Sequence, residues 1–143
     1  MPKFSFTVHG VPQPKGSTKS FAFKRKDGTL GTKTTSDNDN LRPWADTVGW
    51  VARETGIRPT KEPVCVEINF WLPRPKGHFG KKGLRPSAPQ EHTKKPDLDK
   101  LIRGVLDALT HLVWKDDSQV VSIVAGKFYC SETGPGADIT VSW

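Results

Sequence analysis

The segment from Asp97 to Leu112 constrains the fold most, because it carries an apolar stripe at helical spacing. Apolar side chains recur there every three or four residues, which places them on one side of an α-helix. These residues are Leu98, Leu101, Ile102, Val105, Leu109 and Leu112. A helix with one apolar side must bury that side against another layer of the fold.

Alternating apolar and polar residues predict several strands, and another amphipathic segment predicts a further helix. The predicted strands are residues 4–8, 20–24, 30–34, 63–72, 119–129 and 137–143. An Asp27-Gly28 turn predicts that the second and third strands form a β-hairpin. Candidate capping residues from Ser36 to Asn40 precede a helix that we expect to end near Glu54. This order predicts one small α+β domain over residues 1–143, with a mixed or antiparallel sheet and two main helices packed on it.

Residues 73–96 are rich in proline, glycine, lysine and arginine and show no strand or helix periodicity. The segment is too long for a plain connection, so we predict a flexible basic loop with a functional role. Basic side chains bind phosphates, and an aromatic ring can stack on exposed bases. The predicted DNA-binding residues are Lys15, Arg74, Lys76, Phe79, Lys81, Lys82, Arg85, Lys94, Lys95 and Arg103. A solvated surface loop is the alternative interpretation.

The net charge of +7 favours a polyanionic partner, because each phosphate contact releases counterions condensed on nucleic acid. Charge alone leaves the question open, since many basic proteins bind no nucleic acid.

No apolar run approaches the roughly 18 residues of a membrane span, and the N-terminus has no apolar signal segment. Cys65 and Cys130 stand singly in apolar stretches, which favours buried reduced thiols. We therefore expect a cytoplasmic protein.

Two pairs of acids flank the predicted helix in a chain that has only 15 acidic residues. The pairs are Asp97 with Asp99 and Asp116 with Asp117. Mg²⁺ takes oxygen ligands and keeps several waters, so two or three carboxylates suffice to bind it for phosphodiester hydrolysis. In the alternative interpretation, Asp97 caps the helix, Asp99 complements its dipole, and the second pair fills a turn.

The length of the predicted helix separates the two acid pairs. The helix is roughly 22 Å long at 1.5 Å per residue, so the pairs cannot share an ion within one chain unless the turn folds far back. Antiparallel packing of two helices across a twofold axis would bring opposite ends together. We therefore predict a homodimer whose composite metal site takes Asp97 and Asp99 from one subunit and Asp117 from its partner.

Arg103 lies on the same predicted helix, on the face that carries Asp99 and Asp107. We predict that it holds the scissile phosphate or stabilises charge in the transition state. A plain ion pair with either aspartate is the alternative. His92 is a candidate ligand or acid–base group, with an ordinary surface histidine as the simpler interpretation. Glu67, on the polar side of strand 63–72, is a reserve carboxylate.

Three stretches, at residues 95–101, 107–109 and 114–120, read KPDLDKL, DAL and WKDDSQV. Together they resemble the RusA family of Holliday-junction resolvases, whose members are often encoded by phages or prophages. The first strand followed by Pro12-x-Pro14-Lys15-Gly16 is also similar to phage members of that family.

The resemblance implies a homodimer that binds four-way DNA junctions and nicks two strands symmetrically with Mg²⁺ or Mn²⁺, in recombination and repair. The family's essential acids match Asp97, Asp99 and Asp117, and its important helical lysine matches Arg103. Lys100 stands where the family commonly has asparagine. The segment between helix and second acid pair is one residue shorter than in the bacterial type member.

Two alternatives to a junction-resolving endonuclease stay open. One is a non-catalytic basic DNA-binding protein, whose acids only cap helices and fill turns. The other is a metal nuclease that acts on forks or flaps. No Walker A loop, Rossmann fingerprint, GxSxG or HExxH motif occurs, which argues against those enzyme classes.

Overall fold

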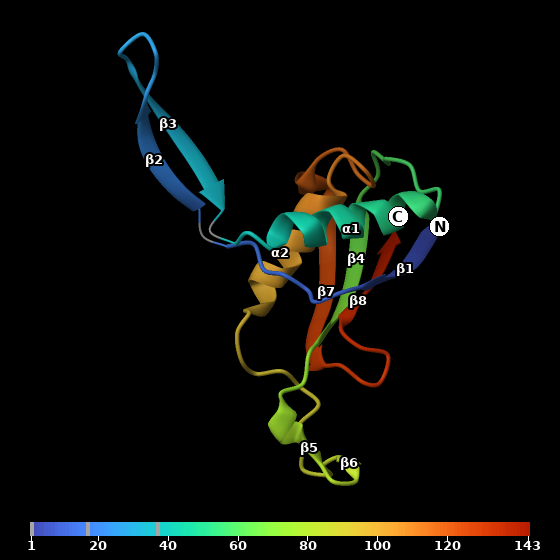
Figure 1. Ribbon diagram of the computed structural model, residues 1–143. Coiled ribbons are helices and arrows are strands. Elements are labelled where there is room, and N and C mark those ends of the chain that lie inside the picture. Colours follow the sequence, from blue (N-terminus) through green and yellow to red (C-terminus); the bar gives the residue numbers. More distant parts are fainter. Residues whose placement is uncertain (1, 17, 37) are drawn as a thin grey trace.

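The computed structural model describes residues 2–16, 18–36 and 38–143, and its elements follow the predicted order (Figure 1). The helices are α1 (Leu41–Glu54) and α2 (Leu98–Leu109). The long strands are β1 (Lys3–His9), β2 (Thr18–Lys24), β3 (Leu30–Ser36), β4 (Val64–Leu72), β7 (Val120–Tyr129) and β8 (Gly136–Ser142). Short elements are the 3₁₀ turns η1 (Lys76–His78) and η2 (Asp117–Gln119) and the strands β5 (Phe79–Gly80) and β6 (Gly83–Leu84).

The main sheet has four strands in the order β1-β8-β4-β7. β8 pairs antiparallel with both β1 and β4, whereas β7 pairs parallel with β4. The sheet is therefore mixed, which is one of the two arrangements that the sequence predicted. A parallel pair needs a crossover connection, and α2 lies in the connection between β4 and β7. α2 consequently runs antiparallel to β7, the strand that it contacts.

The core lies between the helices and one face of the sheet. The alternating side chains of β4 supply its centre, and α1 and α2 cover it with the buried sides of their amphipathic stripes. Buried core residues from these three elements are Val64, Val66, Ile68, Phe70, Leu72, Trp44, Val48, Ala52, Leu101, Val105 and Leu109. Leu98, Ile102 and Leu112, also predicted for the stripe, are half-buried against this cluster.

α2 ends three residues earlier than the apolar stripe predicts. Thr110, directly after Leu109, has an extended backbone with φ −60° and ψ 136°. The next two residues, His111 and Leu112, form a turn that His111 enters with a positive φ of 72°. Within the described part of the chain, no helix is long and apolar enough to cross a membrane.

The predicted hairpin is confirmed and longer than expected, since β2 and β3 pair over seven positions from Thr18↔Ser36 to Lys24↔Leu30. Gly28, with φ 90°, adopts a turn conformation that side chains disfavour. The hairpin projects from the body of the protein (Figure 1). Among the described residues, β2 and β3 make their extensive contacts only with each other.

The segment 73–96 contains regular structure that its sequence did not predict. It forms the turn η1 and the hairpin β5–β6, which lies at the far end of the molecule from β2–β3 (Figure 1). Arg74 anchors the segment, because its guanidinium donates to the carbonyls of Cys130 at 3.0 Å and Pro89 at 2.8 Å.

Cys65 is exposed and Cys130 is half-buried, so the prediction of two buried thiols is wrong for Cys65. Cys65 lies on the sheet face that the helices do not cover.

Candidate active site

Asp97 and Asp99 lie at the N-terminus of α2 with unengaged carboxylates. Asp97 occupies the N-cap position with an extended backbone, but its side chain makes no capping hydrogen bond. Neither carboxylate has a hydrogen-bond or ion-pair partner among the described residues, and both residues are exposed. The helix N-terminus is a favourable place for negative charge. The alternative in which Asp97 serves as a capping side chain is therefore not what the structure shows.

A basic cleft of about 320 Å³ opens beside Asp97. Lys95 and Lys100 line it from the start of α2, and Lys15 lines it from the segment after β1. The Lys15 backbone donates a 3.0 Å hydrogen bond to the carbonyl of Lys100, which joins the two walls. A cleft lined by one carboxylate and several lysines suits a phosphate that is bound together with a cation.

Lys127 positions the chain directly before Asp97. Its ammonium donates to the carbonyls of Lys94 at 2.6 Å and Pro96 at 2.8 Å. Lys127 comes from β7, where it pairs with Phe70 of β4 and so shares the helix-covered face of the sheet. Lys127 was not among the residues that the sequence predicted for the site. A lysine on the buried side of an alternating strand was the available signal, because such a cation needs a partner.

Asp117, in η2, is held by Thr110 and Trp114, which follow the C-terminal end of α2. The Thr110 hydroxyl and the Trp114 indole both donate to its Oδ1, the indole at 3.2 Å. Trp114 is fully buried, whereas Asp117 is exposed. The structure therefore fixes the direction of this carboxylate and leaves Oδ2 free of protein partners within the described residues.

Asp116 has a different, local role. Its side chain accepts the backbone N–H of Ser118 at 2.9 Å and forms a capping box with Gln119. Hydrogen bonds from Ser118 hold the pKa of Asp116 below its ordinary value. The interpretation as a turn residue thus describes Asp116 well, while the Asp117 carboxylate takes no part in the turn's capping hydrogen bonds.

The acid pairs lie at opposite ends of α2, as the helix length predicted. Within one protomer, the described residues contain no group of three or more His, Cys, Asp or Glu side chains placed to hold a metal ion. Glu67 does not complete the site, because it lies on the sheet face opposite the buried Ile68 and the helices. Asp97 and Asp99 offer hard oxygen donors of the kind that Mg²⁺ takes.

Arg103 is exposed on α2 and free of the predicted ion pairs. Among the described side chains the ion pair that forms is Lys15 with Asp107, at 2.6 Å. Asp107 is therefore paired with Lys15 and not with Arg103. This leaves the Arg103 guanidinium available on the surface of α2, one turn after Asp99.

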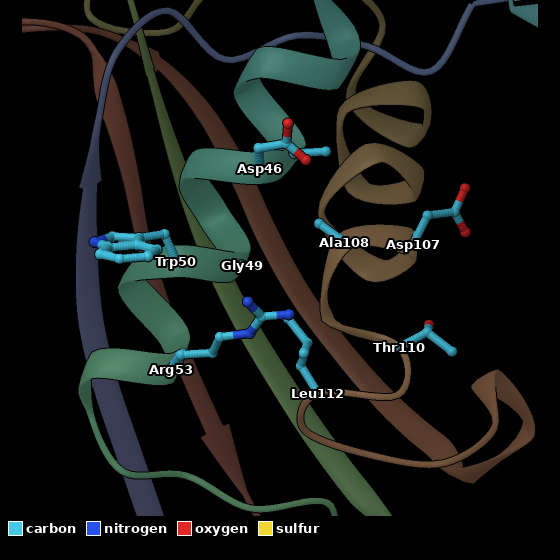
Figure 2. Close-up of a pocket in the computed structure, with 9 residues that line it drawn as sticks. Asp46, Gly49, Trp50, Arg53, Asp107, Ala108, Thr110 and Leu112 are labelled. Carbon is cyan, nitrogen blue, oxygen red and sulfur yellow. The ribbon is translucent and has the colours of Figure 1, made fainter.

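A second open cleft, of about 520 Å³, lies between α1 and α2 (Figure 2). Arg53 extends from α1 toward Leu112, and Trp50 points away from α2 and is 64% exposed. Thr110, the partner of Asp117, lines the same cleft. No sequence pattern predicted this surface, because its residues come from helices far apart in the chain.

The other predicted binding residues lie around the β5–β6 hairpin and before α2. The exposed ones are Lys76, Phe79, Lys81, Lys82, Arg85, Lys94 and Lys95. Arg74 is half-buried and occupied by its backbone acceptors and the Tyr129 ring, 5.3 Å away. His92 also packs on Tyr129, at 4.7 Å between ring centroids. Burial, aided by the nearby Lys127 ammonium, lowers the pKa of His92.

Comparison with known proteins supplies the family. The family model described as "Endodeoxyribonuclease RusA" matches residues 11–142, nearly the whole chain. The chain belongs to the RusA family. Among curated proteins, "Uncharacterized protein YqaN" of Bacillus subtilis (strain 168) is 31% identical over 130 residues, which cover 89% of this chain and 88% of YqaN. Membership of the RusA family places the chain among endodeoxyribonucleases and confirms the resemblance predicted from the acid motifs.

Proposed function

We propose that this RusA-family protein is a metal-dependent, structure-specific endonuclease that resolves four-way DNA junctions by paired symmetric nicks. The observation that carries the proposal is the arrangement of three exposed carboxylates around α2. Asp97 and Asp99 are unpartnered beside a basic cleft, and Asp117 is aimed by Thr110 and Trp114 at the other end. Exposed carboxylates without protein partners are free to bind a hard cation, which takes oxygen ligands.

A second copy of the chain is proposed to join along β7. This strand is at the edge of the sheet and exposes Val121 by 64%, Ile123 by 41% and Val124 by 62%. Residues 90–92 cover the edge near Lys127, so the open edge is the first part of β7. An exposed apolar edge strand is a template for pairing with another strand. Antiparallel pairing of two β7 strands would produce a continuous sheet with both α2 helices on the same face.

This pairing would assemble the composite site. β7 begins directly after Asp117, while its later part holds the chain before Asp97 through Lys127. Antiparallel pairing of the two open segments would therefore bring the start of one β7 toward the middle of its mate, next to the stretch that holds Lys127. The site would combine Asp97 and Asp99 of one subunit with the partner's Asp117, and the dimer would have two such sites for two nicks.

The residues have separate tasks in this site. Asp97, Asp99 and the partner's Asp117 would hold Mg²⁺, or Mn²⁺ in its place, and a bound ion supplies charge neutralisation at the phosphate and a more acidic water. Lys95, Lys100 and Arg103 would bind phosphates along the strand. Arg103 binds as a planar, permanently charged fork, so we assign it phosphate binding in place of proton transfer.

A mixing experiment tests the composite site. Asp99→Asn and Asp117→Asn chains are each expected to bind a mobile four-way junction but not to nick it. Heterodimers of the two variants contain one intact site, so single nicks should return, whereas the control Asp46→Asn on α1 should cut like wild type. Heterodimers that form but never nick would overturn the composite site.

Substrate choice separates the remaining alternatives. The wild-type protein is incubated with a four-way junction, a Y-fork, a flap and a linear duplex, with and without Mg²⁺. A junction resolvase cuts the four-way junction in paired nicks, and a fork or flap nuclease prefers the other branched substrates. Binding without metal-dependent nicking of any substrate would favour the non-catalytic DNA-binding protein.

A further inference from the structure

The β2–β3 hairpin has a high charge and little contact with the rest of the protein. Residues 18–36 hold five of the basic residues and a single acid, which amounts to +4 of the chain's net +7. These basic residues are Lys19, Lys24, Arg25, Lys26 and Lys33. The acid, Asp27, is engaged within the turn, because its carboxylate accepts the Thr29 N–H at 3.0 Å and the Thr29 hydroxyl at 2.6 Å. The hairpin is thus a cationic arm.

Side-chain contacts stabilise the end of the arm. The ring of Phe23 lies across Gly31 on the opposite strand, where a Cβ would meet its Cζ at 2.6 Å. Arg25 lies over the same ring at 5.7 Å and donates to the carbonyl of Leu30 at 3.0 Å. These contacts order the end of the arm, where the Leu30 side chain is 73% exposed to solvent. Isolated two-stranded hairpins are marginal in water, so an arm that makes no extensive contact with the core in the described part of the chain gains stability from a partner.

The arm is rooted at the candidate active site. Lys15 and Gly16, just before β2, and Asn38, just after β3, line the same cleft as Asp97. Seven paired residues extend the arm by about 24 Å at 3.4 Å per residue. That reach corresponds to roughly seven base pairs of B-form DNA. A strand of DNA at Asp97 would therefore continue past the arm.

We propose that the β2–β3 hairpin is a DNA-gripping arm, which binds the duplex flanking the branch point some five to seven base pairs from the nicked phosphate, at roughly the reach estimated above. The inference rests on the proposed function in so far as it takes DNA as the substrate. Charge complementarity selects the partner, since a net +4 arm fits a polyanion and would repel a second copy of itself. A two-stranded ribbon also fits the major groove of duplex DNA.

The test compares the variant Lys24→Gln/Arg25→Gln/Lys26→Gln with the control Lys3→Gln/Arg58→Gln/Lys61→Gln. The control removes three exposed cations from the body and leaves the arm intact. Binding is measured in Ca²⁺ with junctions whose arms are 12, 8 or 4 base pairs long, over a range of salt concentrations. The arm variant should bind the 12-base-pair junction at least tenfold more weakly, with a salt slope lower by about two to three. Shortening the DNA to 4 base pairs should reduce wild-type affinity to that of the variant.

Equal affinities and salt slopes for the arm and control variants would overturn the proposal. A shift of the monomer–dimer equilibrium with unchanged DNA binding would overturn it too, since the arm's occupant would then be a second copy. Nicking in Mg²⁺ at saturating protein separates this inference from the proposed function. If the wild type binds long-armed junctions more tightly than short-armed ones but never nicks them, the DNA-gripping role of the hairpin is supported and the nuclease proposal fails. If it nicks junctions but its affinity does not depend on the length of the DNA arms, the nuclease proposal is supported and the role of the hairpin fails.

Discussion

The Trp114 indole donates a 3.2 Å hydrogen bond to Oδ1 of Asp117, which couples a fully buried ring to an exposed carboxylate. The ring is anchored in the core, so the carboxylate inherits its position from the packing of the domain. Thr110, at the end of α2, donates to the same oxygen. Together these donors fix one oxygen of Asp117 and leave the other without a hydrogen-bond partner among the described residues.

Thr110→Val tests this positioning, because valine keeps the shape of threonine and removes the donor. We expect the nicking rate of a four-way junction to fall about tenfold, and the Mg²⁺ concentration for half-maximal activity to rise, since the carboxylate is no longer oriented. DNA affinity in Ca²⁺ should stay unchanged. Thr110→Ser retains the hydroxyl and should restore most of the activity. An inactive serine variant would contradict a role through the hydrogen bond.

Lys127→Met should disturb the start of α2. The substitution removes the donors to the Lys94 and Pro96 carbonyls, at a cost of about 1–3 kcal/mol in the free energy of unfolding. Urea denaturation measures this cost, and nicking should fall more than junction binding because Asp97 loses its support. Lys61→Met, at an exposed position, is the control. A fully stable and active Lys127→Met protein would show that the loop holds Asp97 without this lysine.

His92 should make stability depend on pH. Its folded-state pKa lies below the ordinary value of 6.5, chiefly through burial, so the unfolded chain binds more protons near that pH. The contribution of His92 to the free energy of unfolding should therefore be complete above pH 6.5 and should decline as the pH falls from 6.5 toward the lowered pKa. His92→Gln should flatten this decline, measured by urea denaturation between pH 7.5 and roughly 5. The exposed His9→Gln variant should keep the wild-type slope.

Ile123→Lys should prevent the proposed dimer. The side chain lies on the open edge strand and is 41% exposed in the protomer, so the monomer should tolerate lysine, whereas a strand-paired dimer would bury a charge. Sedimentation should show a monomer that has lost nicking, with the thermal unfolding midpoint little changed. Trp50→Lys replaces an exposed apolar residue on α1 and is the matched control. A dimeric, active Ile123→Lys protein would exclude β7 as the interface.

The sequence determined most of the fold, because its elements arise from local periodicity. The stripe from Leu98 to Leu109 specifies a helix wherever it packs, and the alternation from Val64 to Leu72 specifies a strand with one buried face. Residues 79–84 were missed, since two-residue strands are too short for any period to be visible. The early end of α2 was missed for a related reason, because Leu112 continues the stripe after the helix has turned away.

The sequence by itself also singled out Asp97, Asp99 and Asp117 as candidate metal ligands, because they lie in compact motifs beside one helix. Only the tertiary structure decided how each carboxylate is used. It left Asp97 unengaged, tied Asp116 into its turn, oriented Asp117 through Trp114, and supplied Lys127 from a distant strand. The physical reason is that side-chain hydrogen bonds depend on which segments the core brings together, and periodicity along the chain does not predict contacts between distant segments.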